Sequence, residues 1–123
     1  MSARSSTVVL VVEDEPLVRM GICDHLEGSG FTVLEAGTAD EAIDILNSRF
    51  DIALVFTDVD MPGSMDGLRL AAAVRDRWPP IKIVVTSGHR QVDAGDLPDD
   101  AAFFSKPYNP DKIVDTFRDM TAR

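Results

Sequence analysis

Apolar runs with little polar alternation recur along this chain and constrain its fold more than any other feature. The first covers Thr7–Val12, and later ones cover Ile52–Thr57 and Ile81–Thr86. A strand with apolar side chains on both sides must be buried on both faces, as the strands of a parallel sheet are. A strand with one face in water would instead show a polar residue at every second position. We therefore expect a sheet that is covered by helices on both faces.

Segments with the period of a helix separate the apolar runs. Pro16 suits the first turn of a helix, and Val18, Ile22 and Leu26 follow it at intervals of four residues. The sequence Gly28-Ser29-Gly30 is expected to end this helix. The pattern predicts an amphipathic helix directly after the first strand.

Residues that favour helix starts precede the other helical segments. Thr38 and Glu41 have the spacing of a capping box. A third helix is expected to open at Asp66-Gly67. Asn109 followed by Pro110 combines an N-cap residue with a proline at the first helical position. These signals predict three further helices.

Strand and helix patterns alternate five times, which predicts an α/β fold with a doubly wound, five-stranded parallel sheet and five flanking helices. The remaining strands are expected at Phe31–Glu35 and Ala101–Ser105. Gln91–Asp100 is the weakest element, because it contains Gly95 and Pro98 among several aspartates. We expect at most a short helix there.

Length and charge bound the class of protein. The chain has 123 residues, which suits one domain. We expect residues 1–6 to be a flexible N-terminus and residues 7–123 to form the domain. The net charge of −9 argues against direct binding to nucleic acid or to an anionic membrane surface. Cys23 is the single cysteine, and no apolar run is long enough for a membrane helix, so we expect a cytoplasmic protein.

Polar residues follow the predicted strands at their carboxyl ends. Glu13 and Asp14 follow the first strand, Asp58 ends the third, Thr86 ends the fourth and Lys106 follows the fifth. In an open parallel sheet, ligands bind at this edge. Carboxylates gathered around one lysine suit a Mg²⁺-dependent site that handles a phosphoryl group.

The chain resembles the receiver domain of two-component response regulators over nearly its whole length. The order and spacing of five motifs carry the resemblance: Val-Val-Glu-Asp-Glu-Pro (11–16), Thr-Asp-Val-Asp-Met-Pro (57–62), Met-Asp-Gly (65–67), Val-Val-Thr-Ser-Gly (84–88) and Ser-Lys-Pro-Tyr (105–108). The resemblance implies a flavodoxin-like fold with strand order 2-1-3-4-5. One extra residue separates the Met-Pro and Met-Asp-Gly motifs and is expected to lengthen the loop beside Asp58.

The resemblance also implies roles in phosphorylation and in metal binding. Asp58 would attack a phosphoryl group and become an aspartyl phosphate. Asp14 and Asp58 would ligate Mg²⁺, Glu13 would hold the ion through water, and the backbone carbonyl of Asp60 would complete the protein ligands.

Other residues would respond to the phosphate. Lys106 would pair with Asp58 and later with a phosphate oxygen, and Thr86 would donate its hydroxyl to another. Phe103 would turn inward behind Thr86. The peptide bond between Lys106 and Pro107 is expected to be cis. His89 is a candidate for tuning the lifetime of the phosphate.

The function that the resemblance implies is a phosphorylation-dependent signalling switch without an output domain, and not a turnover enzyme. A sensor histidine kinase or a histidine phosphotransfer protein would phosphorylate Asp58. The face formed by Gln91–Asp100, Ala101–Ser105 and the last helix would then bind or release a downstream protein target. A phosphorylation-dependent homodimer is a further expectation.

Two alternatives stay open on the sequence alone. Asp58-Val59-Asp60 superficially matches the Asp-x-Asp signature of haloacid-dehalogenase-type hydrolases, although that signature is expected after the first strand of a larger chain. A degenerate receiver that only scaffolds is the other alternative. The presence of Asp14, Asp58, Thr86 and Lys106 together argues against it.

Overall fold

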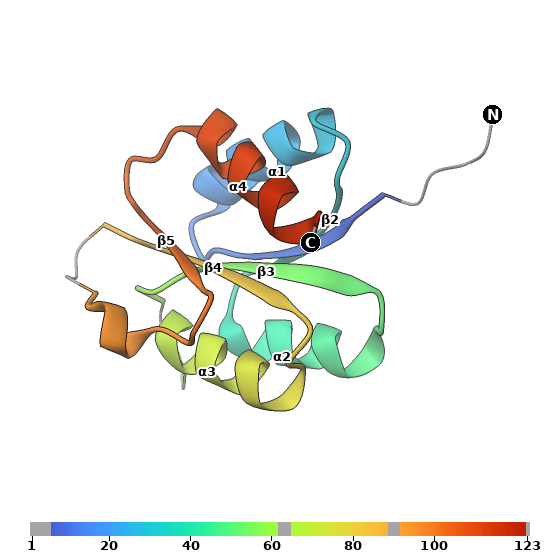
Figure 1. Ribbon diagram of the computed structural model, residues 1–123. Coiled ribbons are helices and arrows are strands. Elements are labelled where there is room, and N and C mark those ends of the chain that lie inside the picture. The colour runs from blue at the N-terminus through green and yellow to red at the C-terminus, as the bar shows by residue number, and fades with distance from the viewer. Residues whose placement is uncertain (1–5, 62–64, 89–91, 123) are drawn as a thin grey trace.

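The computed structural model describes residues 6–61, 65–88 and 92–122. Strands and helices alternate along the chain (Figure 1). The elements are β1 (Val8–Val12), α1 (Pro16–Gly28), β2 (Thr32–Ala36), α2 (Ala39–Ser48), β3 (Ile52–Asp58), α3 (Gly67–Arg77), β4 (Lys82–Ser87), the 3₁₀ helix η1 (Ala94–Asp96), β5 (Ala102–Ser105) and α4 (Pro110–Thr121). The predicted strands are all present, and no observed strand end differs from the predicted one by more than one residue.

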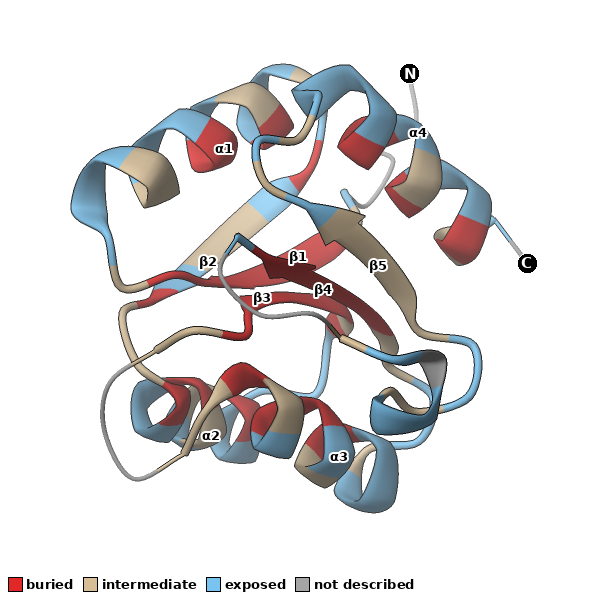
Figure 2. Cartoon of the chain, turned by 90° about the vertical axis from the view of Figure 1, so that its left-hand side faces the viewer, coloured by how far each residue is buried: buried red, intermediate tan, exposed pale blue. Residues whose placement is uncertain are grey.

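The five strands form one sheet of order β2-β1-β3-β4-β5, and all four strand pairs are parallel. This confirms the predicted doubly wound topology. Figure 2 shows α1 and α4 on one face of the sheet and α2 and α3 on the other. Every residue of β1 is buried, whereas β5, at the edge, is half-buried to exposed. Burial on both faces explains why the central strands lack polar alternation.

The number of helices differs slightly from the predicted five, because the described residues contain four α-helices and the three-residue η1. The segment around η1 is the one expected to hold at most a short helix. Gly95 lowers helix propensity and Pro98 cannot donate a backbone hydrogen bond, so a longer helix is not favoured there. The Arg75 side chain donates to the carbonyl of Asp99 at 2.8 Å and ties the segment to α3.

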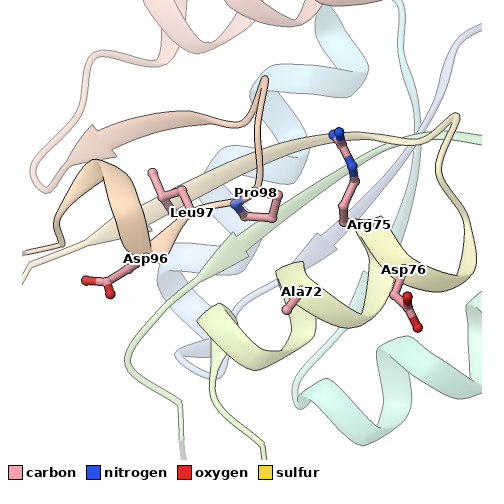
Figure 3. A pocket seen from close by; sticks show the side chains of 6 residues that line it. All are labelled: Ala72, Arg75, Asp76, Asp96, Leu97 and Pro98. Carbon is pink, nitrogen blue, oxygen red and sulfur yellow. The ribbon is translucent and has the colours of Figure 1, made fainter.

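An open pocket of about 550 Å³ lies between α3 and the η1 segment. Figure 3 shows its lining side chains, which are Ala72, Arg75 and Asp76 from α3 and Asp96, Leu97 and Pro98 from the η1 segment. None of the acidic residues predicted to bind metal contributes to this pocket. It is therefore separate from the predicted phosphorylation site.

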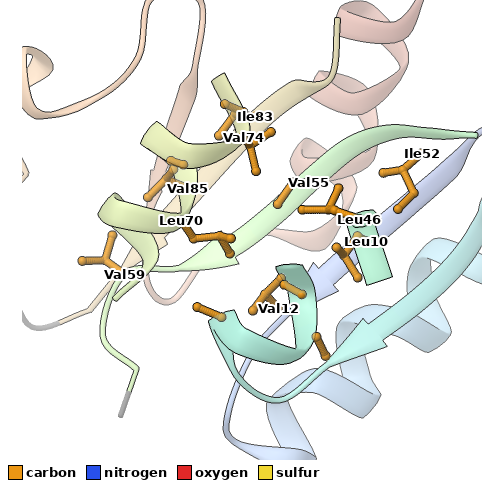
Figure 4. Packing of buried hydrophobic residues seen from close by; sticks show 14 of the residues in the cluster. Leu10, Val12, Leu46, Ile52, Val55, Val59, Leu70, Val74, Ile83 and Val85 are labelled. Carbon is orange, nitrogen blue, oxygen red and sulfur yellow. The ribbon is translucent and has the colours of Figure 1, made fainter. Parts of the chain in front are cut away.

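Two apolar layers enclose the sheet, as the alternation of side chains along each strand requires. Leu10 and Val12 of β1 pack in the layer under α2 and α3, where Figure 4 shows them among side chains of β3 and β4. Val9 and Val11 pack in the other layer, under α1 and α4. Because both layers reach the central strands, the ends of those strands are held rigidly.

Side-chain caps fix three helix starts. Asp66 accepts from the backbone N–H of Arg69 at 2.9 Å, and Asn109 accepts from that of Asp111 at 2.9 Å. Thr38 accepts from the N–H of Glu41 at 3.1 Å, as the capping box predicts. The return bond differs, because the Glu41 carboxylate accepts from the N–H of Gly37 and not from that of Thr38.

The start of α3 lies directly against the end of β3. The N–H of Gly67 donates to the carbonyl of Val59 at 3.0 Å. A Cβ atom at Gly67 would overlap the carbonyl oxygen of Asp58 and lie 2.8 Å from Cα of Val59. Only glycine allows this approach, so Gly67 helps to set the position of Asp58.

We predict that Gly67→Ala lowers the free energy of unfolding by about 1–3 kcal/mol, because the new methyl group has no space beside Asp58. Gly21→Ala is the matched control, since a Cβ atom there meets nothing within 4 Å. Alanine should stabilise α1 at that position by about 0.5–1 kcal/mol. Urea denaturation of both variants checks the prediction. Equal effects of the two substitutions would contradict the close approach.

Candidate functional site

The carboxyl edge of the sheet gathers the side chains that the sequence singled out. Glu13 follows β1, Asp58 is the last residue of β3, and both are buried. Thr86 lies opposite Asp58 in the pairing of β4 with β3 and is also buried. Asp14 and Lys106 are half-buried. Four segments that are distant in sequence therefore meet at one edge, as predicted.

Lys106 bridges two of the acidic residues. Its Nζ donates to Asp58 Oδ2 at 3.1 Å and to Glu13 Oε1 at 3.0 Å. The side chains of Glu13 and Asp58 are each only 5% exposed, so their charges are poorly solvated. The pair with Asp58 agrees with the expected geometry. The pair with Glu13 was not predicted, because sequence spacing does not show which carboxylates one lysine can reach.

Burial and the lysine act in opposite directions on the carboxyl groups. Burial raises the pKa of Asp58 and that of Glu13, and the hydrogen bonds from Lys106 offset this rise only in part. Burial opposes the charge of Lys106, but its hydrogen bonds to Glu13 and Asp58 prevail and raise the pKa of the ammonium group. The site is thus short of positive charge and favours a cation.

Three carboxylates are placed to share one ion. Glu13, Asp14 and Asp58 each offer an oxygen, and these oxygens lie within 4.8 Å of one another. Both oxygens of Glu13 already accept protein hydrogen bonds, from Lys106 Nζ and from the N–H of Glu15 at 3.1 Å. Carboxylate oxygens in this number fit Mg²⁺, which takes few protein ligands and keeps several waters.

Asp60 lies beside the acidic cluster. Its N–H donates to Asp58 Oδ1 at 3.3 Å, and its carboxylate accepts from the Ser87 hydroxyl at 3.1 Å. Its side chain is not one of the three whose oxygens converge among the described residues. No sequence pattern indicated the contact with Ser87, because the two residues are 27 positions apart.

Backbone bonds hold the two strand ends that flank Asp58. The N–H of Val59 donates to the carbonyl of Thr86 at 2.8 Å.

The aromatic residues before and after Lys106 pack on opposite faces of the sheet. Phe103 packs with the layer under α2 and α3, while Tyr108 packs with the layer under α1 and α4. The Lys106-Pro107 peptide is cis, as predicted.

No sequence pattern indicated a role for two residues near the site, Arg19 and Tyr108. Arg19 of α1 donates to the carbonyl of Glu13 at 2.7 Å and to the Glu35 carboxylate at 3.1 Å. Tyr108 meets the ring of Phe56 edge to face, and burial raises the pKa of its hydroxyl to about 12. Arg19 lies one turn beyond Pro16. The sequence pattern of this helix indicated only its apolar face, so it gave no sign of the contacts that Arg19 makes. His89 and the lengthened loop at 62–64 lie outside the described residues.

The chain belongs to the response regulator receiver domain family, whose sequence profile matches residues 9–118. Receiver domains are phosphoacceptor signalling domains. The match covers every strand except Val8, the first residue of β1, and all of the helices except the end of α4. The resemblance seen in the sequence motifs is thereby confirmed.

Two curated relatives align with nearly the whole chain. The sensor kinase CckA of Brucella abortus is 38% identical over 119 residues, which are 94% of this chain and 12% of that kinase. The C4-dicarboxylate transport transcriptional regulatory protein DctD of Rhizobium meliloti is 33% identical over 96% of this chain and 25% of its own length. The chain thus spans a quarter or less of these relatives.

Solved structures share the fold. A response regulator receiver protein from Sinorhizobium medicae superposes with a TM-score of 0.90 at 24% identity over 96% of both chains. The beryllofluoride-activated NtrC4 receiver domain dimer has a TM-score of 0.83 at 27% identity, over 94% of this chain and 96% of its own. TrrA of Thermotoga maritima, solved with Mg²⁺-BeF, has a TM-score of 0.80 at 24% identity, over 93% and 98%.

No helix within the described parts of the chain combines the length and the apolar character that crossing a membrane requires.

We predict that Asp58→Asn stabilises the metal-free protein at neutral pH. Burial raises the pKa of Asp58, so the folded state binds this proton more tightly than the unfolded state does. Ionised Asp58 therefore costs stability above its folded pKa, and that cost disappears as the pH falls toward the ordinary range of carboxyl groups. The advantage of the variant should shrink over the same range. Urea denaturation in EDTA at a series of pH values measures it.

Asp51→Asn is the control, because the pKa of Asp51 is shifted in the opposite direction from that of Asp58. The hydrogen bonds from Arg49 lower the pKa of Asp51, so its ionised form favours the folded state at neutral pH. This variant should gain no stability there. If Asp58→Asn were no more stable than the wild type, the hydrogen bond from Lys106 would outweigh the cost of burying Asp58.

Proposed function

We propose that this domain is a phosphorylation switch in which Asp58 accepts a phosphoryl group. The observation that carries the proposal is the Asp58 carboxylate at the end of β3, hydrogen-bonded to Lys106 and flanked by Glu13 and Asp14. One Asp58 oxygen would attack phosphorus and displace the donor group, which leaves with its bonding electrons. The product is an aspartyl phosphate, and water later releases inorganic phosphate from it.

Mg²⁺ is the cation that this chemistry would use. The ion would neutralise charge on the oxygens of the transferring group. Asp14 and Asp58 would ligate it directly, Glu13 would hold it through water, and the carbonyl of Asp60 would add a ligand. The convergence of three carboxylates supports the assignment. The hydrogen bonds that both oxygens of Glu13 already accept support a contact through water for that residue.

Lys106 and Thr86 are proposed to act on the phosphate. Lys106 would exchange its bond with Asp58 for one with a phosphate oxygen. The hydroxyl of Thr86, which lies opposite Asp58 in the sheet, would donate to another oxygen. Phe103, half-buried on β5, would change its packing as Thr86 moves. The phosphate would thereby shift the population between two packings of this edge.

The phosphoryl donor would be a sensor histidine kinase or a histidine phosphotransfer protein, in the cytoplasm. The surface formed by η1, β5 and α4 would bind or release a downstream protein and would not contact nucleic acid directly. The NtrC4 receiver domain, which is a dimer in its beryllofluoride-activated form, supports a phosphorylation-dependent homodimer. The domain would support its own phosphorylation and dephosphorylation without turnover of other substrates, and would therefore not be a turnover enzyme.

We predict that incubation with acetyl phosphate and Mg²⁺ adds one phosphoryl group per chain, as intact mass spectrometry would show. The Asp58→Asn variant should carry no adduct, because an amide is a poor nucleophile. Lys106→Met should form the adduct at least about tenfold more slowly, because one donor to the transferring group is lost. EDTA should suppress the adduct in every variant.

Asp51→Asn serves as the control for the loss of a carboxylate elsewhere and should be labelled as the wild type is. An adduct that persisted in Asp58→Asn would place the phosphoacceptor at another residue. Steady release of inorganic phosphate from small phosphoesters, with no adduct, would favour a hydrolase. If the protein is neither labelled nor releases phosphate, the remaining interpretation is that it serves only as a scaffold.

A further inference from the structure

A fourth carboxylate, that of Asp60, stands next to the proposed cation site but is turned toward β4. Ser87 Oγ donates to Asp60 Oδ2 at 3.1 Å, and the N–H of Asp60 donates to Asp58 Oδ1 at 3.3 Å. Asp60 is half-buried, and Ser87, the last residue of β4, is buried. Asp60 is therefore held at both its backbone and its side chain.

These bonds are part of a closed ring. The N–H of Lys106 donates to the carbonyl of Ser87 at 3.0 Å, and the Nζ of Lys106 donates to Asp58 Oδ2 at 3.1 Å. The ring runs from Asp58 to Asp60, Ser87 and Lys106 and back to Asp58. Because β3, β4 and β5 each contribute a fixed end, the Ser87 hydroxyl has a defined position from which to hold Asp60.

The Asp60 carboxylate lies near the proposed cation site but is not one of the carboxylates that converge there. Within the described residues, the oxygens that converge come from Glu13, Asp14 and Asp58. Asp60 and Asp58 are in direct contact, because the N–H of Asp60 donates to Asp58 Oδ1 at 3.3 Å. Because of this contact, an Asp60 carboxylate that Ser87 did not hold would lie next to the proposed ion.

The number of carboxylates decides between two common cations. Mg²⁺ requires octahedral geometry and keeps several waters, whereas Ca²⁺ accepts about six to eight oxygens in flexible arrangements. We infer that the Ser87–Asp60 hydrogen bond withholds the fourth carboxylate and thereby sets a preference for Mg²⁺ over Ca²⁺. Ser87 is in this sense a positioning residue. The inference rests on the proposed function, since it concerns the same cation site.

The experiment is a calorimetric titration of the whole chain with MgCl₂ and, separately, with CaCl₂. Ser87→Ala frees the Asp60 carboxylate and should lower the Kd for Ca²⁺ about five- to tenfold, because affinity for Ca²⁺ rises with the number of charged ligands. The Kd for Mg²⁺ should change less than about twofold, because Mg²⁺ gains little from a further carboxylate. Ser87→Thr keeps a hydroxyl and should restore the wild-type ratio of the two constants.

Two further variants separate the Asp60 carboxylate from other effects of the substitution. Ser87→Ala combined with Asp60→Asn should lose the gain for Ca²⁺, because no fourth charge remains. Ser105→Ala removes a hydroxyl from the exposed residue that pairs with Ser87 across β4 and β5, and it should leave both constants unchanged. Asp60→Glu offers a second route, since the longer side chain no longer matches the Ser87 hydroxyl and should also favour Ca²⁺.

The outcomes separate this inference from the proposed function. A wild type that binds no Mg²⁺ would refute the proposed metal site itself. A wild type that binds Mg²⁺, with an unchanged ratio of constants in both Ser87→Ala and Asp60→Glu, would overturn the role of the hydrogen bond. Retention of the Ca²⁺ gain in the double variant would also overturn it, because the gain would not come from Asp60. Thermal denaturation of each variant checks that it is folded.

Discussion

The bridge from Lys106 to Asp58 and Glu13 is the interaction on which the rest of this site depends. It brings a cation from the end of β5 to carboxylates at the ends of β1 and β3, in surroundings where each carboxylate is 5% exposed. A buried carboxylate without such a partner would be driven toward its neutral form. One lysine cannot balance three carboxylates, so the site is electrostatically suited to the divalent cation that we propose. The proposed binding of Mg²⁺ and the proposed phosphoryl transfer therefore depend on the same excess of negative charge.

The fold supplies the rigidity that this arrangement requires. Two apolar layers hold the central strands, and Gly67 lets α3 start against the backbone of Asp58. The strand ends can therefore present charged groups at fixed positions. The same edge carries the Ser87–Asp60 bond, so the backbone that positions Asp58, the proposed nucleophile, also positions the Asp60 carboxylate, which the proposed cation site would not include. The geometry of the sheet edge thus accounts both for the position of Asp58 and for the proposed exclusion of the Asp60 carboxylate from the cation site.

Much of the fold could be predicted, because the decisive signals are local. Continuous apolar runs indicated the strands, and the caps Asp66 and Asn109 indicated the starts of two helices. Gly95 and Pro98 predicted that the segment before β5 holds little helix, but nothing local indicated the bond from Arg75 to Asp99 that ties this segment to α3. For the site, the motifs indicated which residues gather. They could not indicate that Lys106 also reaches Glu13 or that Ser87 holds Asp60, because both contacts depend on the register between strands.

The central claim is that Asp58 carries the phosphoryl group. The most direct test is to phosphorylate the protein, reduce the acyl phosphate with borohydride and locate the modified residue by tandem mass spectrometry of its peptides. Reduction converts an aspartyl phosphate into homoserine, so the account predicts homoserine at position 58 and an unmodified Asp14 and Asp60. Homoserine at another position, or phosphate found on a serine, threonine or histidine, would contradict it.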